Sequence, residues 1–284
     1  MFVIIGAVIV SIAVAGGYVY AGGPLGVLVQ PGEFVIIFGA SIGALAISCP
    51  KKYLGNLAHS ITSLVRPSTY SDESFMELLR MLYELFSSIR KRGLLSLEKD
   101  ISEPESSELF TRYPSFMQNH HAVEYLTDAL SYWLATNAKP YELDHYLETS
   151  METHEEEHVV IPGLLQKVGD ALPGFGIVAA VLGIVVTMQH LDGPPEELGQ
   201  HVAAALIGTF LGILMAYGFV NPMASNLEIS GKDQERYFSM IKVALLAFAQ
   251  GSAPSTAVEL ARKVIFSMDR PTSTDLNNAL KLKS

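Results

Sequence analysis

Two long stretches without a charged side chain constrain the fold of this chain more than any other feature. They run from Ala171 to Gln189 and from Val202 to Val220. At about 1.5 Å per residue, a helix of either length reaches ~28 Å, close to the ~30 Å hydrocarbon thickness of a bilayer. Because the connection between them is short, the pair is predicted to form an antiparallel transmembrane hairpin. That geometry places Pro173 and Pro222 at one membrane face, where two helix breakers suggest a mouth or hinge.

Small residues recur at four-residue spacing along both predicted helices. Inside lipid, helices associate by close packing, so such rows mark the contact between them. Ordinary bundle packing would explain any single pair, but a row over four successive turns is less ordinary. The rows are Ala204, Gly208, Gly212 and Ala216 on the second helix, and Gly176 with Ala180 and Ala179 with Gly183 on the first.

The hairpin lacks the carboxylate that ion transport through a bilayer usually needs. Its polar side chains are Thr187, Thr209 and Tyr217, and Asp170 lies just outside the predicted mouth. If an ion crosses here, we expect another chain to supply the carboxylate.

Two further spans are predicted in the N-terminal part. The stretch from Phe2 to Tyr20 is uncharged, and Phe34 to Ser48 follows Glu33. We interpret Glu33 as a solvated residue at the membrane boundary rather than an ion ligand. The chain is 49% hydrophobic and 17% charged, with its apolar residues in blocks, which indicates a membrane protein with a soluble part. Its net charge of -10 argues against nucleic-acid binding.

The basic residues predict the orientation, because Lys and Arg accumulate on the cytoplasmic side. They flank the large loop and follow the last span, whereas the two short loops contain none: Lys51, Lys52, Arg66, Lys167, Lys232, Arg236, Arg262 and Lys263. We therefore expect an all-α membrane protein with both termini in the cytoplasm. Its four spans are 1–20, 33–50, 169–190 and 199–221; residues 21–32 and 191–198 are periplasmic loops, 51–168 a cytoplasmic helical domain, and 222–284 cytoplasmic helices and a tail.

The soluble part is helical by pattern. Apolar residues recur at helical spacing between Phe75 and Ile89, with Ser71 or Asp72 as the N-cap and Gly93 as the stop. A second helix around Leu126 is predicted to begin at Pro114-Ser115, and a third to begin at Pro140 and run toward the membrane. After Pro222, helices are expected near Tyr237 to Ala249 and from Ala257, followed by a polar tail from Pro271.

One motif resembles a zinc site. His154-Glu155-Glu156-Glu157-His158 has the H-E-x-x-H spacing that places two imidazoles on one helix face. Its many acidic neighbours instead favour a solvated surface, and the hypothetical third ligand, Asp192, lies in a loop predicted on the opposite side of the membrane. No phosphate-binding loop, nucleophile elbow or dinucleotide turn is present. We expect neither an enzyme nor a cofactor.

Opposite charges flank the predicted helix break at Gly93. Arg90 precedes the break and Glu98 follows it. Exposed charges at a turn can dock a partner through electrostatic complementarity, although an ordinary solvated surface has the same composition.

With these residues in view, the chain resembles the MotA family of flagellar stator subunits, within the MotA/TolQ/ExbB group. The resemblance covers nearly the whole chain and is carried by several short segments. They are Gly16-Gly17-Tyr18, Gly22-Gly23, Gln30-Pro31 with Glu33, Leu95-Ser96-Leu97-Glu98, Arg112-Tyr113-Pro114, Val168-Gly169-Asp170, Pro173 through Ala180, Gly208 through Leu214, Asn221-Pro222 and Ala257-Val258-Glu259.

The resemblance implies a bacterial inner-membrane protein in which five copies surround two copies of a MotB-like single-span partner, whose aspartate binds the ion. It assigns Pro173 and Pro222 to the coupling of ion passage to movement. It also implies that Arg90 and Glu98 meet charged residues of the rotor protein FliG.

The resemblance also bears on the ion. Sodium-driven relatives pair two threonines in the ion pathway, whereas this chain has Thr209 and, in the other place, Ala180. Alanine cannot coordinate sodium, so protons are favoured; backbone carbonyls and water are the alternative. An ExbB- or TolQ-like energiser of outer-membrane transport remains a rival, although those relatives have three spans. An intramembrane zinc protease is the other.

Overall fold

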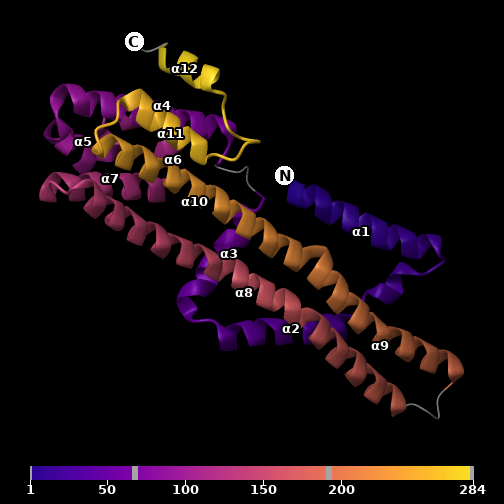
Figure 1. Ribbon diagram of the computed structural model, residues 1–284. Helices are drawn as coiled ribbons and strands as arrows, with labels where there is room; N and C mark the ends of the chain where they lie inside the picture. The colour runs from indigo at the N-terminus through magenta and orange to yellow at the C-terminus, as the bar shows by residue number, and fades with distance from the viewer. Residues whose placement is uncertain (1, 66–69, 190–193, 282–284) are drawn as a thin grey trace. The chain divides into compact units, whose positions relative to one another are not determined.

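The computed structural model describes residues 2–65, 70–189 and 194–281 (Figure 1). These residues form helices and connecting turns and contain no strand. Arg66 and Asp192, used above for orientation and for the zinc alternative, lie outside them. Four helical segments are long and apolar enough to cross a membrane, so the all-α, four-span prediction is confirmed. The chain divides into two compact units, residues 1–67 with 158–229 and residues 68–157 with 230–284.

The first unit holds the apolar helices. Its N-terminal elements are α1 (Phe2–Tyr20), η1 (Leu25–Leu28), α2 (Pro31–Ser48) and α3 (Lys51–Ser63). None of the residues of α1, all of which are described, is buried within the chain. Since α1 is almost wholly apolar, this exposed surface suits contact with lipid or neighbouring chains.

Two long helices contribute to both units. They are α8 (Pro140–Met188), which continues through Pro162 and Pro173, and α10 (Asn221–Ala249). The helix α9 (Pro195–Met215) precedes α10 and is joined to it by a π-helical turn, η5 (Ala216–Val220). The first arm of the transmembrane hairpin is therefore the C-terminal end of α8, and the second arm is α9 together with η5.

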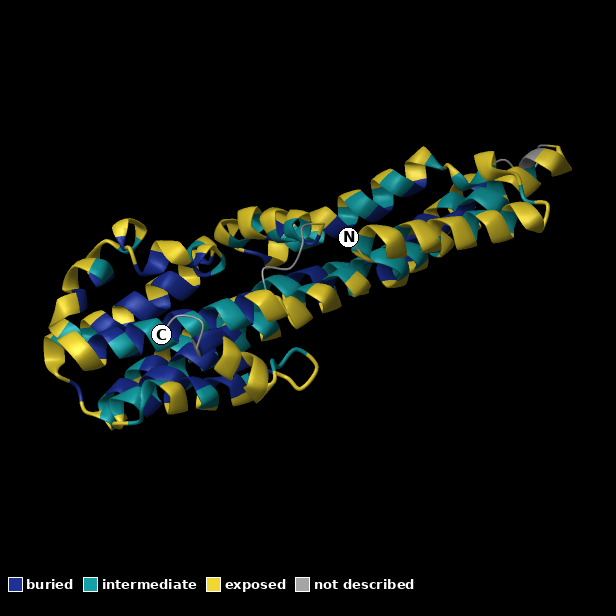
Figure 2. Cartoon of the chain, turned by 90° about the horizontal axis from the view of Figure 1, so that it is seen from above, coloured by how far each residue is buried: buried dark blue, intermediate teal, exposed yellow. Residues whose placement is uncertain are grey.

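The second unit is built around α4 (Asp72–Arg92). Ser71 caps its first turn through a capping box with Ser74, and Gly93, with a φ of 81°, ends it, as the pattern predicted. The predicted apolar face is buried in the core of the unit, whose inner surfaces are coloured as buried in Figure 2. This face comprises Phe75, Leu78, Leu79, Leu82, Leu85, Phe86 and Ile89.

Five short helices and α7 follow α4 along the chain in the second unit. They are η2 (Leu94–Leu97), α5 (Glu98–Ser102), η3 (Pro104–Ser106), η4 (Phe110–Arg112), α6 (Pro114–Gln118) and α7 (His120–Thr136). Pro114-Ser115 opens α6, and Asn119, whose side chain accepts a hydrogen bond from the backbone N–H of Ala122, caps α7. The predicted start of the helix around Leu126 was therefore too early, because a separate single-turn helix precedes it.

The C-terminal part of α10 and α11 (Pro254–Val264) supply the rest of the core. Lys242 of α10 forms ion pairs with Asp144 and Glu148 of α8, which join these two helices within the unit. The aromatic rings of Phe86 and Phe248 stack with their centroids 4.5 Å apart.

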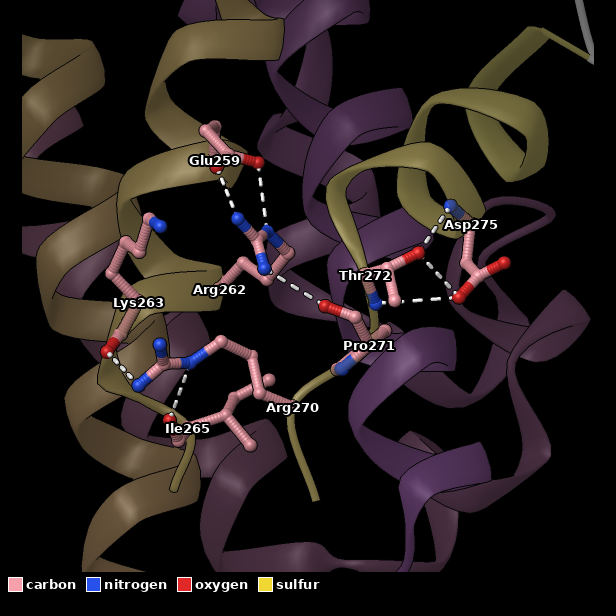
Figure 3. A network of polar contacts seen from close by, with 8 residues as sticks. All are labelled: Glu259, Arg262, Lys263, Ile265, Arg270, Pro271, Thr272 and Asp275. Atoms are coloured by element: carbon pink, nitrogen blue, oxygen red, sulfur yellow. Dashed lines mark hydrogen bonds and ion pairs between the residues drawn. The ribbon is translucent and has the colours of Figure 1, made fainter. Parts of the chain in front are cut away.

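The prediction of a polar tail from Pro271 was wrong. Residues Ser273–Lys281 form α12, and its Leu276 and Leu280, four residues apart, are 2% and 8% exposed. Thr272 and Asp275 cap this helix through reciprocal hydrogen bonds. Figure 3 shows these bonds and Arg262, which donates to the carbonyl of Pro271 and pairs with Glu259. The helix forms because it buries an apolar face that the polar composition conceals.

Candidate functional site

Close contact between α8 and α9 forms a seam of small residues along the hairpin. A methyl group placed on Gly176 would lie 2.7 Å from the carbonyl oxygen of Gly208, and one on Gly212 would lie 2.5 Å from that of Leu172. Near the other end of the hairpin, a methyl on Gly183 would lie 2.9 Å from the Cβ of Ala205. The contact positions rise along one helix as they fall along the other, so the predicted antiparallel hairpin and its small-residue contact are confirmed.

The two prolines lie at one end of this seam. Gly169 contacts the side chain of Asn221, and Asn221 donates a hydrogen bond to Asp170 over 3.5 Å. Counted from the contact of Gly169 with Asn221, Pro173 and Pro222 are five residues of helix rise apart along the hairpin, or about 8 Å. Pro173 is half-buried and Pro222 is exposed.

The π-helical turn η5 lies directly before Asn221 and Pro222. Proline has no backbone N–H and its ring crowds the carbonyl of the preceding turn, so one helical hydrogen bond is lost at Pro222. The N–H of Asn221 instead donates to the carbonyl of Ala216, five residues earlier. π-turns are frequent at functional sites. Sequence analysis named Asn221 with Pro222 in the resemblance but gave Asn221 no role, and it did not predict the π-turn.

Ala180 and Thr209 each lie against a glycine of the opposite helix of the seam. The backbone nitrogen of Ala180 lies 3.1 Å from the position of a methyl group on Gly208, the neighbour of Thr209. Ala180 is buried and Thr209 half-buried. The Cα of Thr209 lies 3.3 Å from the methyl position of Gly176, one turn of α8 before Ala180. The two residues that the resemblance assigned to the ion pathway therefore both lie in the seam.

The prediction for Glu33 was wrong. This residue was predicted to be a solvated boundary residue, but it is only 8% exposed. Its Oε2 lies so close to Gly208 that a methyl group on that glycine would collide with it. Its Oε1 lies 3.4 Å from the position of a methyl group on Gly183. The reason is the packing of α2 against α9, which aims the first turn of α2 into the seam. The hairpin therefore has a carboxyl group from its own chain.

Arg90 and Glu98 lie in the other unit. Arg90 is in the last turn of α4 and Glu98 is the first residue of α5, and both are exposed. Their placement on either side of the break at Gly93 agrees with the sequence prediction.

A cavity of about 690 Å³ opens beside the end of α4, in the same unit as Arg90. Four basic side chains line it, against the carboxylate of Glu84: Arg80, Lys91, Arg92 and Arg112. Arg112 pairs with Glu84 at 2.9 Å, and Arg92 donates to the hydroxyl of Ser88 over 2.6 Å. The surface is locally basic on a chain that is acidic as a whole, which suits an acidic partner.

His154 of the H-E-x-x-H motif is used in packing. Its ring lies 5.1 Å from that of Phe238 and 6.4 Å from that of Tyr125, measured between centroids. Within the described ranges, no group of three or more His, Cys, Asp or Glu side chains could hold a metal ion.

These features define the class of the protein: a multi-pass membrane subunit with a close-packed helical hairpin and a helical domain that continues from it. Comparison with known families agrees. Residues 4–93 match the motility protein A N-terminal family, and residues 117–240 match the MotA/TolQ/ExbB proton channel family. The chain belongs to the motility protein A family.

Its relatives cover almost its full length. It is 39% identical to motility protein A of Salmonella typhimurium over 281 residues, which is 99% of this chain and 95% of the relative. It is 35% identical to the chemotaxis protein LafT of Vibrio parahaemolyticus over 276 residues, 97% of each. The match of residues 4–93 to a motility protein A model favours the stator interpretation over the ExbB- or TolQ-like and zinc-protease alternatives.

Solved structures share the fold. A structure of C. jejuni MotAB superposes with a TM-score of 0.79 at 21% identity and covers 95% of this chain and 98% of the other. The flagellar MotAB stator complex of Bacillus subtilis gives 0.77 at 22% identity, with the same coverage.

Proposed function

We propose that this chain is the stator subunit of a bacterial flagellar motor and forms, with a MotB-like single-span partner, an ion channel whose flux turns the rotor. The observation that carries the proposal is the continuity of α8. This one helix of 49 residues contains Pro173 and the seam at one end and core residues of the soluble unit at the other. A change of packing at the seam can therefore be transmitted along a single helix.

The family resemblance supports one arrangement of the complex, which is part of the proposal. Five copies of the chain surround two copies of the partner in the bacterial inner membrane, and both termini are cytoplasmic. Residues 51–168 and 222–284 then form the cytoplasmic part. The exposed apolar surface of α1 supports this assembly, because it leaves a large area for lipid and neighbouring subunits.

The proposed step is a change of packing around the partner. Neutralising the partner's aspartate with an ion changes which arrangement of α8 and α9 it prefers, and the ring advances. An ion drives such a step only if it binds the two arrangements with different affinity. The proline at each side of the mouth and the π-turn beside Pro222 support this role, because they weaken the helices where movement is needed.

The rotor contact is assigned to Arg90 and Glu98, which meet oppositely charged groups of FliG. Their exposure and the basic cavity beside α4 support a charged partner surface. The ion is a proton, because Ala180 stands in one of the two places where sodium-driven relatives have threonine and offers no side-chain oxygen, whereas sodium binding favours several oxygen ligands.

The assembly is tested by the native mass of the full chain expressed with its single-span partner and purified in mild detergent. We expect five copies of the chain with two of the partner and no zinc. A species of one or two copies that carries stoichiometric zinc would overturn the proposal and return attention to His154, Glu155 and His158.

The function is tested in cells that lack their own stator genes. Expression of the chain with its partner should restore swimming. Failure to swim, combined with restored uptake in cells that lack their ExbB or TolQ proteins, would assign the chain to outer-membrane energisation instead.

A further inference from the structure

Glu33 presents a buried carboxyl group that the proposed mechanism does not use. Its Oε2 is buried without a hydrogen-bond partner among the described residues. Among the residues that the structure describes, Glu33 also takes part in no ion pair. A carboxylate in apolar surroundings is unfavourable unless it binds a proton or a cation, so ionisable groups at membrane depth are usually functional.

The depth of Glu33 follows from its neighbours. It lies against Gly183 of α8 and Gly208 of α9, each about six residues from the loop end of its apolar stretch, or ~9 Å of helix rise. Counted from these glycines, Ala180 is three residues further inward on α8, and Thr209 is one residue further inward on α9. Glu33 therefore lies on the loop side of the two residues assigned to the ion pathway.

The groups that face Glu33 leave it without a permanent counter-charge. On α8, the hydroxyl of Thr187 already donates to the carbonyl of Gly183 over 2.8 Å. On α9, Ala205 and Gly208 face it, and His201 is the titratable residue on the same helical face toward the loop. On α2, Ser41 is two turns further inward, 2% exposed, and its Oγ is also without a partner among the described residues.

Two buried polar groups on one face of α2 thus point toward the hairpin: Glu33 and, eight residues along, Ser41. The glycines beside Glu33 make the space for its carboxyl group, because a methyl group on Gly208 would collide with Oε2. An apolar residue could fill this space without leaving a buried carboxyl oxygen, such as Oε2, that has no hydrogen-bond partner among the described residues.

We propose that Glu33 is a proton-binding site of the ion pathway within this chain, placed between the loop side and the partner's aspartate. This inference rests on the proposed function. A hydronium ion from the loop side transfers its proton to Oε2 and leaves as water. The O–H bond then breaks as the proton passes inward to the partner's carboxylate, and Glu33 returns to its starting state.

The test is infrared difference spectroscopy of the full complex as the buffer pH is changed, with ¹³C-labelled glutamate. The label separates glutamate carboxyls from the partner's aspartate. We expect a protonated-carboxyl band that shifts with the label and with D₂O and is lost in Glu33→Gln. In the matched control Glu196→Gln, which removes an exposed carboxyl group at the start of α9, the band should remain.

Motor rotation supplies the second readout. Glu33→Gln should lose most of the rotation with native mass unchanged, whereas Glu33→Asp, which keeps a carboxyl group, should retain it and its pH dependence. If Glu33→Gln does not assemble, the labelled wild-type and Glu33→Asp complexes still decide, because the Asp variant must lose the glutamate-labelled band.

Two results would overturn the inference. One is an infrared spectrum and a rotation speed of Glu33→Gln equal to the wild type at every pH. The other is a band that responds to sodium but not to pH, which would make the ligand sodium. If the wild-type complex turns no motor, the proposed function fails, while the infrared result on Glu33 stands by itself.

Discussion

At the scale of single residues, the exposed charges at the Gly93 break give a direct prediction. Reversing both in Arg90→Glu with Glu98→Lys should abolish most rotation by opposing the rotor's charges. Because both side chains are exposed, the change in stability should stay within about 0.5 kcal/mol. Single-motor speed and thermal melting of the complex are the measurements. Glu105→Lys, at an exposed site elsewhere in the unit, is the control, and an equal loss of speed in it would remove the special role of the pair.

Glu259 gives a pH prediction. Hydrogen bonds from the Arg262 guanidinium lower the pKa of the Glu259 carboxyl in the folded chain. A lowered folded-state pKa stabilises the fold above the ordinary carboxyl range, and this stabilisation is lost as the pH falls through the lowered value. The melting temperature of the wild-type complex should therefore drop more steeply on acidification than that of Glu259→Gln. Parallel curves would show that the pair has no such effect.

At the scale of elements, the contact between α8 and α9 can be tested with two glycines of one helix. In Gly176→Ala, the added methyl group would lie 2.7 Å from the carbonyl oxygen of Gly208, so the helices must separate. Such overpacking costs about 1–3 kcal/mol. For Gly174→Ala, no described atom lies within 4 Å of the methyl position, so rotation and melting temperature should be unchanged. Equal effects of the two variants would contradict the seam.

The docking of α12 is a second element-scale prediction. Leu276→Ala removes a buried side chain at a cost of about 2–5 kcal/mol, which should release the helix. Hydrogen exchange of the amides of residues 273–281 should then become fast, while α4 stays protected. Asn278→Ala, on the exposed face of the same helix, should leave exchange slow. Slow exchange in Leu276→Ala would mean that other contacts hold α12.

At the scale of the whole molecule, elements marked by patterns that extend over many residues could be predicted from the sequence. Short elements and features that depend on tertiary contacts could not. The hairpin follows from two charge-free stretches, and α4 follows from its apolar spacing and its cap at Ser71. By contrast, α12 has nine residues, and a helix so short is marginal until tertiary contacts stabilise it. Its polar composition therefore concealed Leu276 and Leu280.

The candidate site was predicted in the same uneven way. The hairpin geometry singled out Pro173 and Pro222, the resemblance added Ala180 and Thr209 as ion-pathway residues, and the seam follows from the spacing of small residues. Glu33 could not be placed from sequence, because it is far from the hairpin along the chain and only the packing of α2 brings it there. A buried Glu beside two glycines is a tertiary signal rather than a sequence motif.

The measurement that tests the central claim most directly is the rotation speed of single motors driven by this chain and its partner, in cells without other stators, while the proton and sodium gradients are collapsed in turn. Proton flux through the complex is proposed to drive the rotor. Rotation should therefore stop when the proton gradient is removed at a constant sodium gradient, and continue when sodium alone is removed. Rotation that follows sodium, or no rotation under either gradient, would contradict the account.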